Sequence, residues 1–156
     1  MRMTRFAVWF VATILLLACT ATPARLTKPQ FIARWNAICV SDERPLDALS
    51  QQVPGPLTDE TLPQYAKLFA ESARLLRIEI KDLKDVRPPV EDQIVVDRIL
   101  GHLEAGIAQI GRLRDAASHG HIEAVATAGQ NEGLADAREL AQRYGVDPGC
   151  FGGTGE

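Results

Sequence analysis

Residues 91–117, EDQIVVDRILGHLEAGIAQIGRLRDAA, form a long amphipathic stretch in the middle of the chain. Apolar side chains recur in it every three or four residues, which is the spacing of one face of an α-helix. These positions are Val96, Ile99, Leu103, Ile107, Ile110 and Leu113. The spacing predicts a helix about 40 Å long. The turn Ser118-His119-Gly120 is expected to end it.

Two amphipathic segments precede this helix. The first is expected to begin after Thr27, which forms a capping box with Gln30, and Pro45 is expected to stop or kink it. Its apolar face consists of Phe31, Trp35, Ile38 and Cys39. The second segment runs from Thr61 to Arg87-Pro88-Pro89, with apolar positions at Tyr65, Phe69, Ala73, Leu76, Ile80 and Leu83. Residues 51–58 between them are predicted to form a loop.

A fourth amphipathic helix is predicted over residues 121–144, with Gly145 as the residue that ends it. No stretch of the chain alternates apolar and polar residues as a half-buried strand does. The fold class is therefore all-α, and short connections favour an up-and-down antiparallel four-helix bundle over residues 28–150. Residues 151–156 are expected to form a loose tail.

The N-terminus has the pattern of a secretory signal peptide. Arg2 and Arg5 precede 13 uncharged residues, which are too few to span a membrane. The run ends in Leu16-Leu17-Ala18-Cys19, which resembles the lipobox at which bacterial lipoproteins are lipidated and cleaved. We therefore expect residues 1–18 to be removed, Cys19 to carry the lipid and residues 19–27 to form a tether. The alternative is an ordinary cleavage site next to a chance cysteine.

The charge of the chain gives no sign of a nucleic-acid partner. The 156 residues include 17 basic and 20 acidic side chains, for a formal charge of −3. Removal of Arg2 and Arg5 with the signal peptide leaves 15 basic residues against 20 acidic ones, or −5. Such a domain is not drawn to an anionic membrane by its own charge, so the expected membrane contact depends on the lipid.

Cys39 and Cys150 remain once Cys19 is assigned to the lipid. Two cysteines outside the cytosol are most simply paired in a disulfide. In an up-and-down bundle the last helix returns toward the start of the first, which brings Cys150 within reach of Cys39. We therefore predict a bond between them that closes a loop of 111 residues.

Three segments together resemble a group of small, largely uncharacterised actinobacterial lipoproteins. They are Phe31–Cys39, the stretch from Leu83 to Pro89, and Tyr144-Gly-Val-Asp-Pro-Gly-Cys150. The resemblance implies a helical domain tied by a disulfide, and it implies no activity.

Side chains that could support catalysis or bind a metal are sparse. His119 and His121 flank one turn, and His102 lies 17 residues before His119, about 25 Å along a straight helix. We expect polar loop positions for the first two and a half-buried packing role for His102. No Gly-x-Ser-x-Gly, Cys-x-x-Cys or phosphate-binding glycine loop occurs. The sequence therefore predicts no enzyme, no metal site and no cofactor.

Small residues form the one unusual feature of the predicted fourth helix. Ala126, Gly129, Gly133 and Ala137 share its inward face, and glycine inside a helix costs about 1 kcal/mol relative to alanine. They allow either close packing against another helix or a ligand cleft between helices. We accordingly expect an extracytoplasmic membrane lipoprotein that binds another envelope protein or acts as a structural module. The alternative is a carrier of a small apolar ligand.

Overall fold

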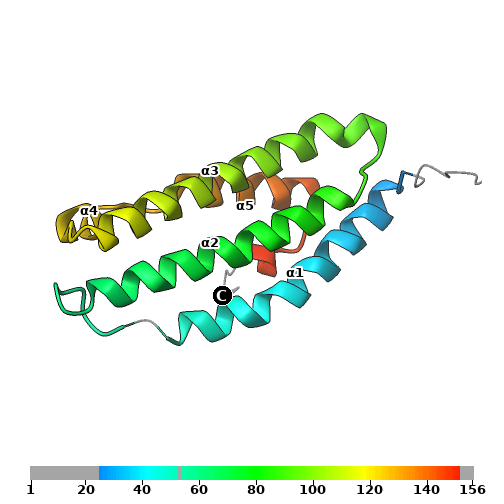
Figure 1. Ribbon diagram of the computed structural model, residues 1–156. Coiled ribbons are helices and arrows are strands. Elements are labelled where there is room, and N and C mark those ends of the chain that lie inside the picture. The colour runs from blue at the N-terminus through cyan, green and yellow to red at the C-terminus, as the bar shows by residue number, and fades with distance from the viewer. Residues whose placement is uncertain (1–24, 53, 152–156) are drawn as a thin grey trace, which may run out of the picture.

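The computed structural model describes residues 25–52 and 54–151, and the residues predicted to form a signal peptide lie outside these ranges, as does Cys19. The described residues are helical, with no strand among them, so the predicted all-α class is confirmed. Figure 1 shows three long helices side by side with alternating direction, and a shorter one behind them. The elements are α1 (Lys28–Ser50), α2 (Leu62–Asp85), η1 (Val90–Asp92), α3 (Gln93–Ser118), α4 (Ile122–Ala126), α5 (Glu132–Tyr144) and η2 (Pro148–Phe151).

Helix α1 begins where the capping pattern predicted and runs past its internal proline. The backbone N–H of Thr27 donates to Oε1 of Gln30 at 3.0 Å. The sequence left open whether Pro45 stops the helix or only kinks it, and the helix continues through Pro45 to Ser50. An internal proline costs a helix about 3 kcal/mol. Burial of Leu49, which is 8% exposed, favours keeping the turn beyond Pro45 helical.

The apolar faces of α2 and α3 contribute half of the residues in the core cluster. Both helices are amphipathic, and most of their buried apolar positions lie three, four or seven residues from another one. The side chains that they place in the core cluster are Ala73, Ile80 and Leu83 from α2, and Val96, Ile99, Leu100, Leu103, Ile107 and Ile110 from α3. Tyr65, Phe69 and Leu76 of the predicted α2 stripe are only partly buried.

Aromatic side chains join α1 to α5 near the start of α3. Phe31 and Trp35 of α1 are 0% and 1% exposed, and their rings meet edge to face at 5.5 Å. Phe31 also meets Tyr144 of α5 edge to face at 6.0 Å. The hydroxyl of Tyr144 donates to Oδ2 of Asp92 at 2.8 Å, and burial together with this bond raises the pKa of Tyr144 far above its ordinary value. The tyrosine is therefore a neutral donor that fixes the end of α5 against α3.

The prediction of one continuous helix over residues 121–144 is wrong, because this segment forms two helices in the structure. Helix α4 ends at Ala126, residues 127–131 form a connection, and α5 begins at Glu132. Asn131 caps α5, since its side chain accepts a hydrogen bond from the backbone of Leu134 at 3.2 Å. Gly129 lies in the connection, where its low helix propensity carries no cost.

The C-terminal segment turns back onto α1. Gly145 ends α5 as predicted, with φ at 110°, a left-handed conformation that glycine adopts readily. The N–H of Asp147 then donates to Oδ1 of Asn36 at 3.1 Å. Beyond it, the Sγ atoms of Cys39 and Cys150 lie 2.31 Å apart, with 5.0 Å between their Cα atoms. The predicted cysteine pair is therefore brought to disulfide distance, with 111 residues of separation.

We expect the double variant Cys39→Ala/Cys150→Ala to be less stable than the oxidised protein. Closing a loop of 111 residues removes chain entropy from the unfolded state, worth about 4 to 5 kcal/mol. Urea denaturation followed by circular dichroism measures the difference. Alkylation of the native protein before peptide mapping is the accompanying check, and two alkylated, unlinked cysteines would contradict the bond.

Candidate functional site

Gly133 lies where α5 crosses α3, with the two backbones in contact. A Cβ built on Gly133 would stand 2.5 Å from the backbone N of Gly106 and 2.8 Å from the carbonyl oxygen of His102. Real Cβ atoms do not approach backbone this closely. The space beside Gly133 is therefore filled by the α3 backbone. Of the two alternatives that the sequence allowed, close helix packing and a ligand cleft, the structure has close packing at this residue.

Asn131 holds this crossing together from the α5 side. Its Nδ2 donates to the carbonyl oxygen of Gly106 at 2.9 Å, while its Oδ1 accepts from the backbone of Leu134. One side chain thus caps α5 and binds α3. Neither Asn131 nor Gly106 is among the site residues predicted from the sequence. The signal for Asn131 was the run Gly129-Gln130-Asn131, in which a glycine precedes a favoured capping residue.

The other members of the predicted seam do not form one face with Gly133. Ala137 is fully buried in the core, at 0% exposure. Ala126, at the end of α4, is exposed. Gly129 is also exposed, and a Cβ placed on it would meet nothing within 4 Å. The break after α4 separates the four positions, so only Gly133 and Ala137 face other helices.

Gly133→Ala is expected to lower the free energy of unfolding by about 1 to 3 kcal/mol, because the added methyl group forces the two backbones apart. Gly101→Ala is the matched control, since it lies inside α3 with open space around its Cβ position. The control should gain up to about 1 kcal/mol from helix propensity. Urea denaturation of both variants measures the pair, and equal stability would contradict the close crossing.

The three histidines do not gather. The rings of His119 and His121 stack with centroids 6.1 Å apart, and Nδ1 of His119 lies 2.7 Å from the carbonyl oxygen of Asp115. His102 lies on α3 with its Nδ1 3.3 Å from Oδ2 of Asp136 on α5. Within residues 25–52 and 54–151, no group of three or more His, Cys, Asp or Glu side chains is placed to hold a metal ion.

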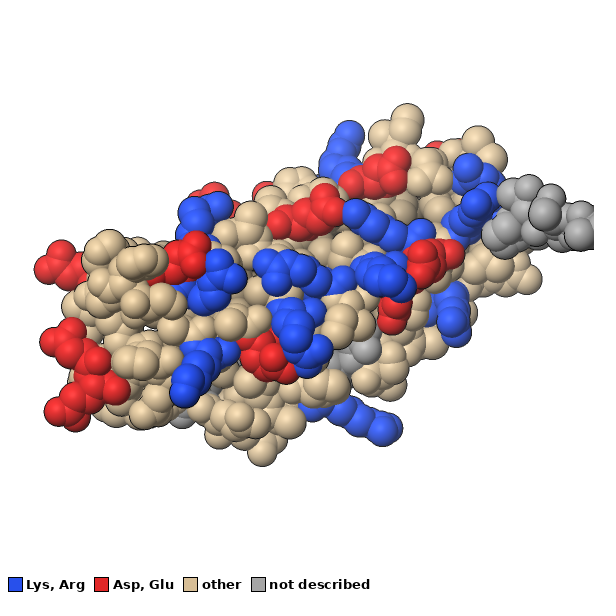
Figure 2. All heavy atoms as spheres, in the orientation of Figure 1, with Lys and Arg blue, Asp and Glu red and all other residues tan. Residues whose placement is uncertain are grey.

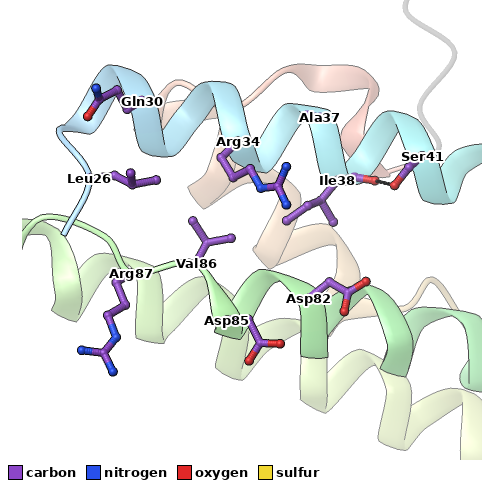
Figure 3. Close-up of a pocket in the computed structure, with 10 residues that line it drawn as sticks. All are labelled: Leu26, Gln30, Arg34, Ala37, Ile38, Ser41, Asp82, Asp85, Val86 and Arg87. Carbon is purple, nitrogen blue, oxygen red and sulfur yellow. Dashed lines mark hydrogen bonds between the residues drawn. The ribbon is translucent and has the colours of Figure 1, made fainter. Parts of the chain in front are cut away.

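An open groove of about 820 Å³ runs between α1 and the C-terminal part of α2. Figure 3 shows its two walls, with Arg34 reaching from α1 into the space and Val86 pointing toward α1. The walls carry both charged and apolar side chains. The lining residues are Leu26, Gln30, Arg34, Ala37, Ile38, Ser41, Asp82, Asp85, Val86 and Arg87.

Some charged side chains of the groove have ion-pair partners among the described residues and others do not. Asp82 and Asp85 lie 3.8 Å and 3.4 Å from Nζ of Lys81, which is also on α2. Arg34 has no ion-pair partner among the side chains that the structure describes, and Figure 3 shows Arg87 turned away from α1. Arg34 is therefore a cation that a molecule entering the groove would meet.

Other basic side chains gather over α2, as Figure 2 shows, with acidic ones between them. Several are paired. Nε of Arg74 donates to Glu71 at 2.8 Å, and Lys84 forms an ion pair with Glu104 of α3. This surface is therefore a partly neutralised face of α2 rather than a continuous cationic patch.

Comparisons of the chain with family models, with characterised proteins and with solved structures found no match. Among the described helices, none combines the length and the apolar character that crossing a membrane requires.

Proposed function

We propose that the chain is a lipoprotein anchored through Cys19 on the outer face of the cell membrane, with a non-enzymatic helical domain that binds another envelope protein. The observation that carries the anchor is the sequence itself. A basic start, a short apolar run and Leu16-Leu17-Ala18-Cys19 occur together. The Cys39–Cys150 pair supports this placement, because disulfides persist in oxidising compartments outside the cytosol.

The groove between α1 and α2 supports the interaction role. It is open to solvent along its length, and its apolar side chains lie beside charged ones. Small apolar ligands favour enclosed pockets that cover most of their surface. A segment of a protein, with an apolar side chain against Ile38 and Val86 and a carboxylate toward Arg34, matches this lining better. The carrier alternative relied on space beside Gly133, and no observation now favours it.

Cys19→Ala is expected to prevent lipid attachment, so that the protein is released from membranes or keeps its signal peptide. Fractionation of cells that express the full chain, followed by mass spectrometry of the N-terminal peptide, measures both outcomes. Thr20→Ala is the matched control, because it changes the neighbouring residue and leaves the thiol. A Cys19→Ala protein that is cleaved and still membrane-bound like the wild type would contradict the anchor.

A photo-crosslinking residue at Ala37 is expected to capture one envelope protein in intact cells. Ala37 lines the groove and is exposed, so the replacement leaves the core unchanged. Adding Arg34→Glu should abolish the adduct by placing a like charge opposite the partner carboxylate. A crosslinking residue at exposed Lys67 on α2, outside the groove, is the control. The same adducts from both positions, or an adduct that survives Arg34→Glu, would contradict the groove as the binding surface.

A further inference from the structure

Three apolar side chains are exposed at the corner between α2 and α3. Val90 of η1 is 69% exposed, and Ile94 and Val95 in the first turn of α3 are 74% and 38% exposed. Val90 and Ile94 are four residues apart, so they lie next to each other across the start of the helix. Small exposed apolar groups are common on soluble proteins. We call these three residues the apolar corner. Their place in the fold, next to the point where the chain enters the domain, distinguishes them from other exposed apolar side chains.

The chain enters the domain at this same corner. Nη1 of Arg25 donates to the carbonyl oxygen of Pro88 at 3.0 Å and to Oε1 of Gln93 at 2.8 Å. The backbone N–H of Leu26 donates to the carbonyl oxygen of Arg87 at 3.3 Å. Figure 1 shows the start of α1 and the α2–α3 connection at one end of the molecule. The tether predicted over residues 19–27 is therefore too long at its C-terminal end, because Arg25 and Leu26 already bond to the domain.

The length of chain between Cys19 and Arg25 limits how far the corner can lie from a membrane. Arg25 lies six positions after Cys19, and an extended chain covers at most about 3.6 Å per residue, so the span is about 22 Å at most. The opposite end of the bundle is separated from the corner by the whole length of α2. That helix has 24 residues and is about 36 Å long. A lipid on Cys19 therefore holds the apolar corner, and not the far end, close to the bilayer.

The charges of the two ends favour the same orientation. Basic side chains around the corner slightly outnumber acidic ones, although the processed chain as a whole is acidic. Figure 2 shows acidic side chains gathered at the opposite end, where Asp59 and Glu60 precede α2. The basic residues at the corner are Arg25, Lys28, Arg87 and Arg98, and the acidic ones are Glu91, Asp92 and Asp97. Asp92 accepts a bond from Tyr144 and Asp97 one from Gln93, so both carboxylates have partners in the protein.

We propose that the apolar corner inserts Val90, Ile94 and Val95 into the headgroup region of the phospholipid bilayer that holds the Cys19 lipid. The domain then stands on the membrane with its long helices directed away from the surface. Apolar side chains that enter the boundary between headgroups and acyl chains gain from burial whenever the chain is already held there. This inference rests on the proposed lipid attachment at Cys19.

The test places a tryptophan at the corner and asks whether lipid quenches it. The lipidated full chain carrying Ile94→Trp is incorporated into vesicles of acyl-brominated phosphatidylcholine. Trp35, the other tryptophan of the processed chain, is 1% exposed and gives a constant background. We expect the new tryptophan to lose much of its emission relative to unbrominated vesicles, and its maximum to move to shorter wavelength. Val90→Trp should behave in the same way.

Val40→Trp is the matched control, since Val40 is 59% exposed on α1, about 18 Å along the helix from Lys28. Its emission should be unchanged by brominated lipid. Equal, weak quenching at positions 94, 90 and 40 in a protein whose Cys19 carries lipid would overturn the corner contact and leave the anchor intact. Quenching at 40 alone would assign the membrane contact to another face. Mass spectrometry that finds Cys19 unmodified would overturn both proposals together.

Discussion

The contact between the backbones of α3 and α5 at Gly106 and Gly133 determines the placement of the whole C-terminal part of the domain. Because neither residue has a side chain, the helices approach until Asn131 reaches the carbonyl of Gly106. This position brings Tyr144 to Asp92 and Phe31, near the start of α3. Because Tyr144 is held in place, the turn at Gly145 directs the following residues back to α1, where Cys150 lies next to Cys39. A bulkier residue at the crossing would displace every contact that follows it.

Most of the helices could be predicted because each has a long apolar face or a recognisable start. The repeating apolar positions of α2 and α3 and the Thr27–Gln30 cap of α1 are local signals. The division of the last helix was missed because small residues at helical spacing fit either a continuous helix or a break. Deciding between them depends on α3, whose Gly106 gives Asn131 its second bond. That contact joins residues 25 positions apart, and the spacing of apolar residues along the sequence does not predict it.

The candidate site was harder to predict than the fold. Arg34, Ala37 and Ser41 lie on one side of α1, and a solvated helix face has the same composition. They line a groove only because α1 begins beside the end of α2, where the backbone of Leu26 bonds to that of Arg87. Leu26 and Arg87 contribute to both the groove and the corner where the chain enters. If Cys19 carries the proposed lipid, a partner in the groove would bind near the membrane.

The cysteine pair also determines how the protein would respond to mechanical force. Tension applied between a lipid on Cys19 and the C-terminal end passes along α1 to Cys39 and crosses directly to Cys150. The chain between these cysteines, a separation of 111 positions, then carries no load and cannot be extended while the bond is intact. Only α1 up to Cys39 and the short segments outside the pair can lengthen. An anchored protein of this design would yield by a short, fixed extension, and reduction of the bond would expose α2–α5 to the pull.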